Sequence, residues 1–94
     1  MHIACLRGHL TVIKALVTAG ADINAKDVDN NTPTHFCSEY GHSFCLKFIL
    51  TKEPYLFDSN NEGKSPIDVA NSSDILQVSF FLVFIFILGF LRFY

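Results

Sequence analysis

The amino-acid sequence predicts an all-α protein made of stacked helical repeats, followed by one hydrophobic C-terminal helix. Three observations lead to this fold class. Residues recur with a period of 33 over positions 1–77. Apolar residues within each period have the spacing of helices rather than of strands. Residues 78–94 are nearly all apolar and hold a single charged residue, Arg92.

The 33-residue period is carried by identical residues. Five pairs lie 33 positions apart, namely His2 and His35, Gly8 and Gly41, His9 and His42, Lys14 and Lys47, and Thr18 and Thr51. A third copy begins at Ser65-Pro66, which lie 33 positions after Thr32-Pro33. A period of this length is typical of units that bury their apolar faces by stacking on neighbouring copies.

Three short motifs recur in register with this period. Residues 32–35 read TPTH, a Gly-His pair occupies 8–9 and again 41–42, and residues 20–25 read GADINA. These motifs resemble the T-P-L-H, the G-H between two helices, and the G-A-D-[IV]-N-A hairpin lead-in of the ankyrin repeat, with Thr34 in place of Leu. The resemblance implies a fragment of an ankyrin-repeat solenoid, built from helix–turn–helix units that are joined by hairpin loops.

The resemblance covers about 2⅓ repeats. The first repeat begins at Met1, inside the T-P-L-H motif, so we expect it to lack its own hairpin. The chain is thereby divided into four segments, which are a truncated repeat one at 1–25, repeat two at 26–58, the start of repeat three at 59–77 and the hydrophobic tail at 78–94.

Repeat one contains a clear amphipathic helix. Apolar residues within 12–17 form a stripe with helical spacing, while Lys14 and Thr18 lie on the opposite face. Gly20 follows this helix and Gly41 follows the first helix of repeat two. Both glycines are expected to adopt the left-handed conformation of a C-terminal cap.

The hairpin and the next helix start have their own residue signals. Asn30 stands at the hairpin position where the family usually has Gly, and Gly63 stands there in repeat three. Asn tolerates positive φ better than most residues do. Thr32 is expected to cap the following helix, and Pro33 suits its first position because a missing N–H costs nothing there.

Repeat two departs from the pattern at its end. Where repeat one has AGADINA, repeat two has KEPYLFD. Pro54 is expected to end the second helix of this repeat, because proline lacks the N–H that a helix interior needs. Tyr55, Leu56 and Phe57 are expected to pack under the hairpin.

Charge and cysteine usage exclude several function classes. Residues 1–77 carry six basic and nine acidic side chains, and no run of basic residues suggests nucleic acid, so no nucleic-acid partner is expected. Cys5, Cys37 and Cys45 are an odd number without CxxC spacing, which favours a reducing, cytoplasmic compartment. All three are expected to be small buried hydrophobic residues.

The histidines follow the repeat rather than a catalytic or metal pattern. His2 and His35 are equivalent positions, as are His9 and His42. The resemblance implies that such pairs make structural hydrogen bonds between loops and helices. We therefore expect no metal, no cofactor and no catalytic site.

The expected function is protein–protein interaction without catalysis, with an unidentified protein partner. The resemblance implies that the hairpin tips and the exposed face of the first helix of each repeat bind that partner. Leu6 and Arg7 lie on this face, and Tyr40 is the strongest single expectation because exposed aromatic residues are enriched at binding hot spots. The candidate residues are Asp27, Asp29, Asn31, Ser38, Glu39, Tyr40, Asn61, Glu62 and Lys64.

The tail has two open interpretations. Ile75–Tyr94 is 20 residues long and would span about 30 Å as a helix, enough to cross a bilayer core. This interpretation predicts a tail-anchored membrane adaptor whose repeats face the cytosol.

The other interpretation is intron read-through. Gln77-Val78-Ser79 can be encoded by a splice-donor sequence, and the apolar run replaces an expected amphipathic helix from that point. Because both ends interrupt a repeat, the hypothesis is a truncated gene model, in which the coding sequence runs on into an intron.

Overall fold

The computed structural model describes residues 1–52 and 54–70. Over these residues it contains helices and loops and no strand. The helices are α1 (His2–Arg7), α2 (Leu10–Thr18), α3 (Pro33–Glu39) and α4 (Ser43–Leu50). The second pair begins close to 33 residues after the first, which confirms the helical repeat within this part of the chain. The hydrophobic C-terminal helix expected at residues 78–94 lies outside the described residues.

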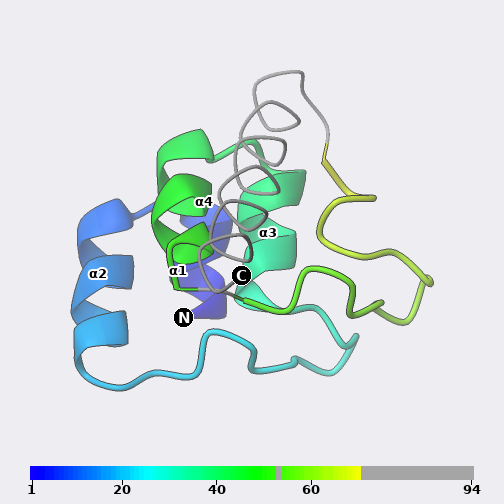
Figure 1. Cartoon of the computed structure of the whole chain (residues 1–94), viewed down its shortest axis with the longest axis horizontal. Coiled ribbons are helices and arrows are strands. Elements are labelled where there is room, and N and C mark those ends of the chain that lie inside the picture. Colours follow the sequence, from blue (N-terminus) through cyan, green and yellow to red (C-terminus); the bar gives the residue numbers. More distant parts are fainter. Residues whose placement is uncertain (53, 71–94) are drawn as a thin grey trace, which may run out of the picture.

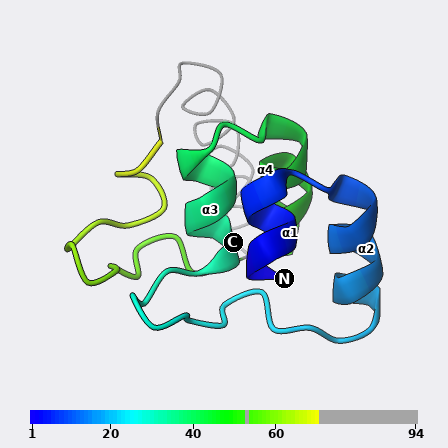
Figure 2. The ribbon, with the colours of Figure 1, turned by 180° about the vertical axis from the view of Figure 1, so that it is seen from behind.

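The helices form a two-by-two array. Helices α1 and α3 pack side by side, as do α2 and α4, and each repeat's two helices also contact one another. The loops that follow α2 and α4 run past the helix ends and extend beyond α3, away from α2 (Figure 1). Seen from behind, α1 and α3 lie between α2 and the loop tips (Figure 2). We call α1 and α3 the inner helices and α2 and α4 the outer helices.

Thr32 caps α3 as its sequence position predicts. Its side chain accepts a hydrogen bond from the His35 main-chain N–H, while Nδ1 of His35 accepts one from the Thr32 N–H at 3.0 Å. Histidine thus fills the place that Glu or Gln takes in the usual capping box. In repeat three the Ser65 main-chain N–H and hydroxyl donate to the Asp68 carboxylate, which holds the pKa of Asp68 below its ordinary value.

The turn between the two helices of each repeat needs glycine. Gly8 and Gly41 have φ of 70° and 73°, and Gly20 also has a positive φ. The left-handed caps expected at Gly20 and Gly41 are therefore confirmed. At Gly8 a second constraint operates, because a Cβ would lie 2.5 Å from Nδ1 of His42. Asn30 has φ of 62°, which confirms that it replaces glycine at the hairpin tip.

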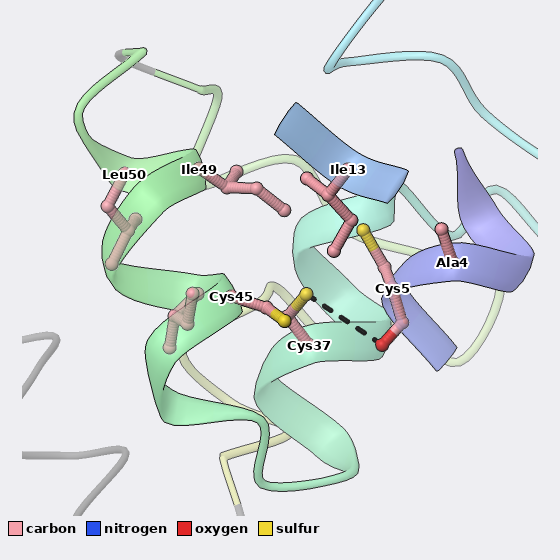
Figure 3. Packing of buried hydrophobic residues seen from close by; sticks show 8 residues of the cluster. Ala4, Cys5, Ile13, Cys37, Cys45, Ile49 and Leu50 are labelled. Atoms are coloured by element: carbon pink, nitrogen blue, oxygen red, sulfur yellow. Dashed lines mark hydrogen bonds between the residues drawn. The ribbon is translucent and has the colours of Figure 1, made fainter. Parts of the chain in front are cut away.

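The core lies between the four helices and contains two kinds of side chain (Figure 3). Aliphatic residues and all three cysteines are buried, and the thiols are free. The buried hydrophobic residues are Ala4, Cys5, Ile13, Cys37, Cys45, Leu46, Ile49 and Leu50. Since burying one Ile or Leu side chain contributes about 1.5–3 kcal/mol, this cluster supplies much of the stability.

The cysteines behave as the sequence predicts. The Cys37 thiol donates to the Cys5 carbonyl at 3.8 Å, across the junction between the two repeats (Figure 3). Its hydrogen bond with the Cys5 side chain and its burial both raise the pKa of Cys37. Burial also raises the pKa of Cys45. These two thiols are therefore protonated at neutral pH and act as small buried hydrophobic groups.

The end of repeat two corrects one expectation. Leu56 packs partly against the core, but Tyr55 and Phe57 are exposed rather than packed under the hairpin. The reason is that this loop pairs through its main chain, with the Tyr55 N–H donating to Oδ1 of Asn24 at 2.8 Å. Helix α4 ends at Leu50, whose carbonyl the ring of Pro54 would meet if the helix continued.

Candidate protein-binding surface

Each hairpin is closed by a side chain at its first position. The Asp27 carboxylate accepts hydrogen bonds from the main-chain N–H groups of Asp29 and Asn31, at 3.0 and 2.8 Å. In the next hairpin, 33 residues later, Oδ1 of Asn60 accepts hydrogen bonds from the equivalent main-chain N–H groups of Glu62 and Lys64. Asp27 is therefore committed to holding its own turn, although the sequence analysis placed it among the partner-binding candidates.

A ladder of asparagines joins the two hairpins. Nδ2 of Asn30 donates to Oδ1 of Asn61 at 2.7 Å, and Nδ2 of Asn60 donates to Oδ1 of Asn31 at 2.9 Å. The Asn61 main-chain N–H also donates to the Asp29 carbonyl at 2.9 Å. Asn31 and Asn61 thus have a structural role, which is to keep the hairpin tips side by side.

His2 and His35 tie hairpins to inner helices, as the resemblance implies, whereas the exposed His9 makes no side-chain hydrogen bond within the described residues, which corrects the expectation for that position. Nε2 of His2 lies 2.9 Å from the Ala25 carbonyl oxygen and 3.0 Å from that of Asn31. Its equivalent, His35, donates from Nε2 to the Lys64 carbonyl at 2.9 Å. Within residues 1–52 and 54–70 no three His, Cys, Asp or Glu side chains lie where they could share a metal ion.

Ser38 is a correction to the candidate surface. Its side chain is 1% exposed, and its hydroxyl donates to the Pro66 carbonyl at 2.6 Å. Ser38 therefore faces the next repeat rather than the solvent. The period could have revealed this, because Cys5, which lies 33 positions earlier, is equally buried.

The exposed face of the inner helices carries a row of rings. Tyr40 is 52% exposed and stacks on Phe36, with ring centroids 6.5 Å apart. Phe36 in turn meets the edge of the His2 ring at 5.8 Å. Phe36 thus contacts both rings, and its stacking on Tyr40 favours one orientation of the exposed Tyr40 ring.

Sequence reasoning missed three apolar members of this surface. Ile3 and Val28 are 67% and 93% exposed, and Phe36 is half-buried. Ile3, Phe36 and Val69 are spaced by 33 residues, so an apolar side chain recurs at one position of the repeat that lies outside the buried cluster. This recurrence in the sequence could have identified Ile3 and Phe36 as members of the surface.

Charged residues surround these apolar side chains. Asp29, Glu39, Glu62 and Lys64 are exposed. Nζ of Lys64 lies 3.7 Å from a Glu62 carboxylate oxygen, a solvent-exposed pair that contributes little to stability. We define the inner surface as the half-buried Phe36 together with exposed side chains of the inner helices, their C-terminal ends and the hairpin tips, namely Ile3, Arg7, Val28, Asp29, Glu39, Tyr40, Glu62 and Lys64.

No helix within the described parts of the chain is both long and apolar enough to cross a bilayer. The tail-anchor interpretation concerns residues 75–94, outside those parts.

Comparison with known proteins agrees with the geometry. A family model described as ankyrin repeats, in three copies, matches residues 1–84. The chain is 35% identical over 78 residues to the target of rapamycin complex 2 subunit AVO2 of Saccharomyces cerevisiae, covering 80% of this chain and 18% of that protein. It is 33% identical over 76 residues to protein phosphatase 1 regulatory subunit 12A of Mus musculus, and that match covers 81% of this chain and 7% of the relative.

A further relative is the SH3 and multiple ankyrin repeat domains protein 2 of Homo sapiens, which is 30% identical over 70 residues. That match covers 74% of this chain and 4% of the relative. The chain thus spans less than a fifth of the length of each of these relatives. Given the family match and the 33-residue helical register, this chain belongs to the ankyrin-repeat family.

Proposed function

We propose that the chain is a non-catalytic module that binds a protein segment across the inner surface. The observation that carries this proposal is the stacked pair of Phe36 and Tyr40, which leaves a large aromatic side chain half exposed at the C-terminal end of α3. Exposed aromatic residues held in place by packing are typical anchors of protein interfaces, since little conformational freedom is lost on binding.

The chemistry of the inner surface favours a partner with apolar side chains and a positive charge. Ile3 and Val28 offer further apolar contact. Asp29, Glu39 and Glu62 carry three negative charges against the two positive charges of Arg7 and Lys64, so a basic residue in the partner would meet a small excess of complementary charge.

Two features support a function without catalysis. The thiols of Cys5, Cys37 and Cys45 are all buried, so none is presented to a substrate, although the hydrogen bond with Cys37 lowers the pKa of Cys5 while those of Cys37 and Cys45 are raised. The ring nitrogens of His35 are occupied by the capping interaction and by the Lys64 carbonyl. Two relatives, AVO2 and protein phosphatase 1 regulatory subunit 12A, are named as subunits, which supports a role in binding proteins. We propose the cytoplasm as the place of this role, because the cysteine usage favours a reducing compartment.

Site-specific photo-crosslinking tests this proposal. A benzophenone amino acid at position 40 should capture a discrete partner in cells that make the chain. The matched control carries the same group at Thr11, which is exposed on the outer helix α2. If both positions capture the same set of proteins in the same amounts, the inner surface is not the binding site.

The tail-anchored adaptor is the second candidate. It is favoured by the composition of residues 78–94, where seventeen residues contain one charge. Fractionation of cells that make the chain with and without residues 75–94 tests it. An anchor predicts that only the longer chain stays in membranes after a carbonate wash, and equal release of both chains contradicts it.

A further inference from the structure

The outer helices carry a charge distribution unlike that of the hairpins. Lys14 on α2, Lys47 on α4 and Lys52 in the turn after α4 are all exposed. Neither α2, with the sequence LTVIKALVT, nor α4, with SFCLKFIL, contains an acidic residue. Among the described residues, Asp22, Asp27, Asp29, Asp58 and Glu62 lie in the two loops, so the outer helices themselves carry positive charge alone.

Two phenylalanines lie among these lysines. The ammonium groups of Lys14 and Lys52 are 5.7 and 5.5 Å from the centroid of the Phe48 ring. That of Lys47 is 5.7 Å from the centroid of Phe44. Such cation–π contacts hold the ammonium groups close to the helix surface. We name Lys14, Phe44, Lys47, Phe48 and Lys52 the Lys–Phe patch.

Phe44 gives the patch an apolar tip. Its side chain is 74% exposed, although Phe is among the residues that gain most from burial. The first turn of α4 holds it next to Lys47, so an apolar group and a cation are presented together. A partner that fits both must combine negative charge with an apolar layer just beneath it.

We propose that the Lys–Phe patch docks on the surface of an anionic lipid bilayer. Lysine is attracted to anionic headgroups at the membrane surface, while Phe partitions into the boundary between headgroups and acyl chains. Nucleic acid fits less well, because single-stranded bases stack on free aromatic faces and Lys14 and Lys52 lie over Phe48. Docking through the outer helices leaves the inner surface open.

The protein offers a clean reporter because it contains no tryptophan. Phe44→Trp places one Trp in the patch, and circular dichroism verifies that the helices are kept. Vesicles of phosphatidylcholine with about one third phosphatidylserine should shift its emission to the blue in low salt, and ~0.5 M salt should reverse the shift by screening. Pure phosphatidylcholine should give no shift.

Three controls distinguish local docking from other contacts. Val28→Trp, at a hairpin tip that is 93% exposed, should show no shift with the same vesicles. Changing Lys14, Lys47 and Lys52 together to Gln in the Phe44→Trp chain should weaken binding at least about tenfold. Lys26 lies on the loop side, where its Nζ is 3.8 Å from the Asp58 carboxylate, so Lys26→Gln should change vesicle binding by less than about twofold.

Three outcomes would overturn the proposal. The first is an equal shift with neutral and anionic vesicles, and the second is a shift of Val28→Trp that matches that of Phe44→Trp. The third is a larger shift of Phe44→Trp with a polyglutamate peptide than with anionic vesicles, which would assign the patch to an acidic polypeptide. If position 40 captures no partner, the proposal for the inner surface fails, but the vesicle test of the Lys–Phe patch is not affected.

Discussion

Nε2 of His42 in repeat two donates a hydrogen bond to the main-chain carbonyl of Leu6 in repeat one, at 2.8 Å. The imidazole passes directly beside Gly8, where a Cβ would lie 2.5 Å from its Nδ1. The contact satisfies a carbonyl near the end of α1, which has no partner within its own helix. One side chain thereby links two repeats, and its partner repeat must present glycine to admit it.

Gly8→Ala should destabilise the protein more than Gly20→Ala does. Both positions have positive φ, at 70° and 91°, so each substitution costs about 1–2 kcal/mol in backbone strain. A Cβ at Gly20 meets nothing within 4 Å, whereas one at Gly8 displaces His42. Urea unfolding followed by circular dichroism measures the difference, which should exceed about 1 kcal/mol. Equal losses would show that the close approach has no energetic consequence.

His35→Ala should cost about 2–4 kcal/mol of unfolding free energy. The ring is fully buried, and its loss leaves the Lys64 carbonyl and the Thr32 N–H without their partner. His9→Ala is the matched control, because His9 is exposed at the start of α2 and should change stability by less than about 0.5 kcal/mol. Similar effects of the two substitutions would contradict a structural role specific to His35.

Thr34→Val should stabilise the protein by about 1 kcal/mol. The Thr34 side chain is 1% exposed, and in the described part of the chain its hydroxyl has no hydrogen-bond partner. Valine keeps the shape and removes the unpaired group. Thr11→Val, at an exposed position, should be close to neutral. A thermal midpoint that falls in Thr34→Val would mean that the hydroxyl is bonded in solution.

The raised pKa of Cys37 predicts a loss of stability at alkaline pH. The unfolded thiol ionises near pH 8.5 while the folded one stays protonated, so its contribution is complete below that pH and is lost above it. The unfolding free energy should fall by at most about 1.4 kcal/mol per pH unit from this thiol. Cys37→Ala should show a shallower decline between pH 8.5 and 10.5, and identical slopes would exclude this cause.

Local chemistry explains which parts of this fold could be predicted from the sequence. Asn30, Thr32 and Gly41 act through their own main chain or the adjacent turn, so their conformations follow from residue type and period. Ser38 and Phe57 could not be placed in this way. The first is buried by the following repeat, and the second is exposed in a loop whose sequence departs from that of repeat one, so the repeat offered no equivalent position from which to place it.

The residues of the candidate surface also differ in how far the sequence could predict them. Tyr40 was predictable as an exposed aromatic residue, but its stacking on Phe36 depends on how two turns of α3 project side chains. Asp27, Asn31 and Asn61 were expected to meet a partner because they are polar residues in hairpins. Their hydrogen bonds also close and join those hairpins, which depends on the register between repeats, while their contact with a partner stays a prediction.

The central claim is that a protein partner binds across the inner surface, and calorimetry of the partner captured at position 40 tests it most directly. Tyr40→Ala should weaken the dissociation constant at least about tenfold, whereas Thr11→Ala should leave it within about twofold. The unfolding midpoint of each variant verifies that both remain folded. Equal affinities of Tyr40→Ala, Thr11→Ala and the unchanged chain would contradict the claim.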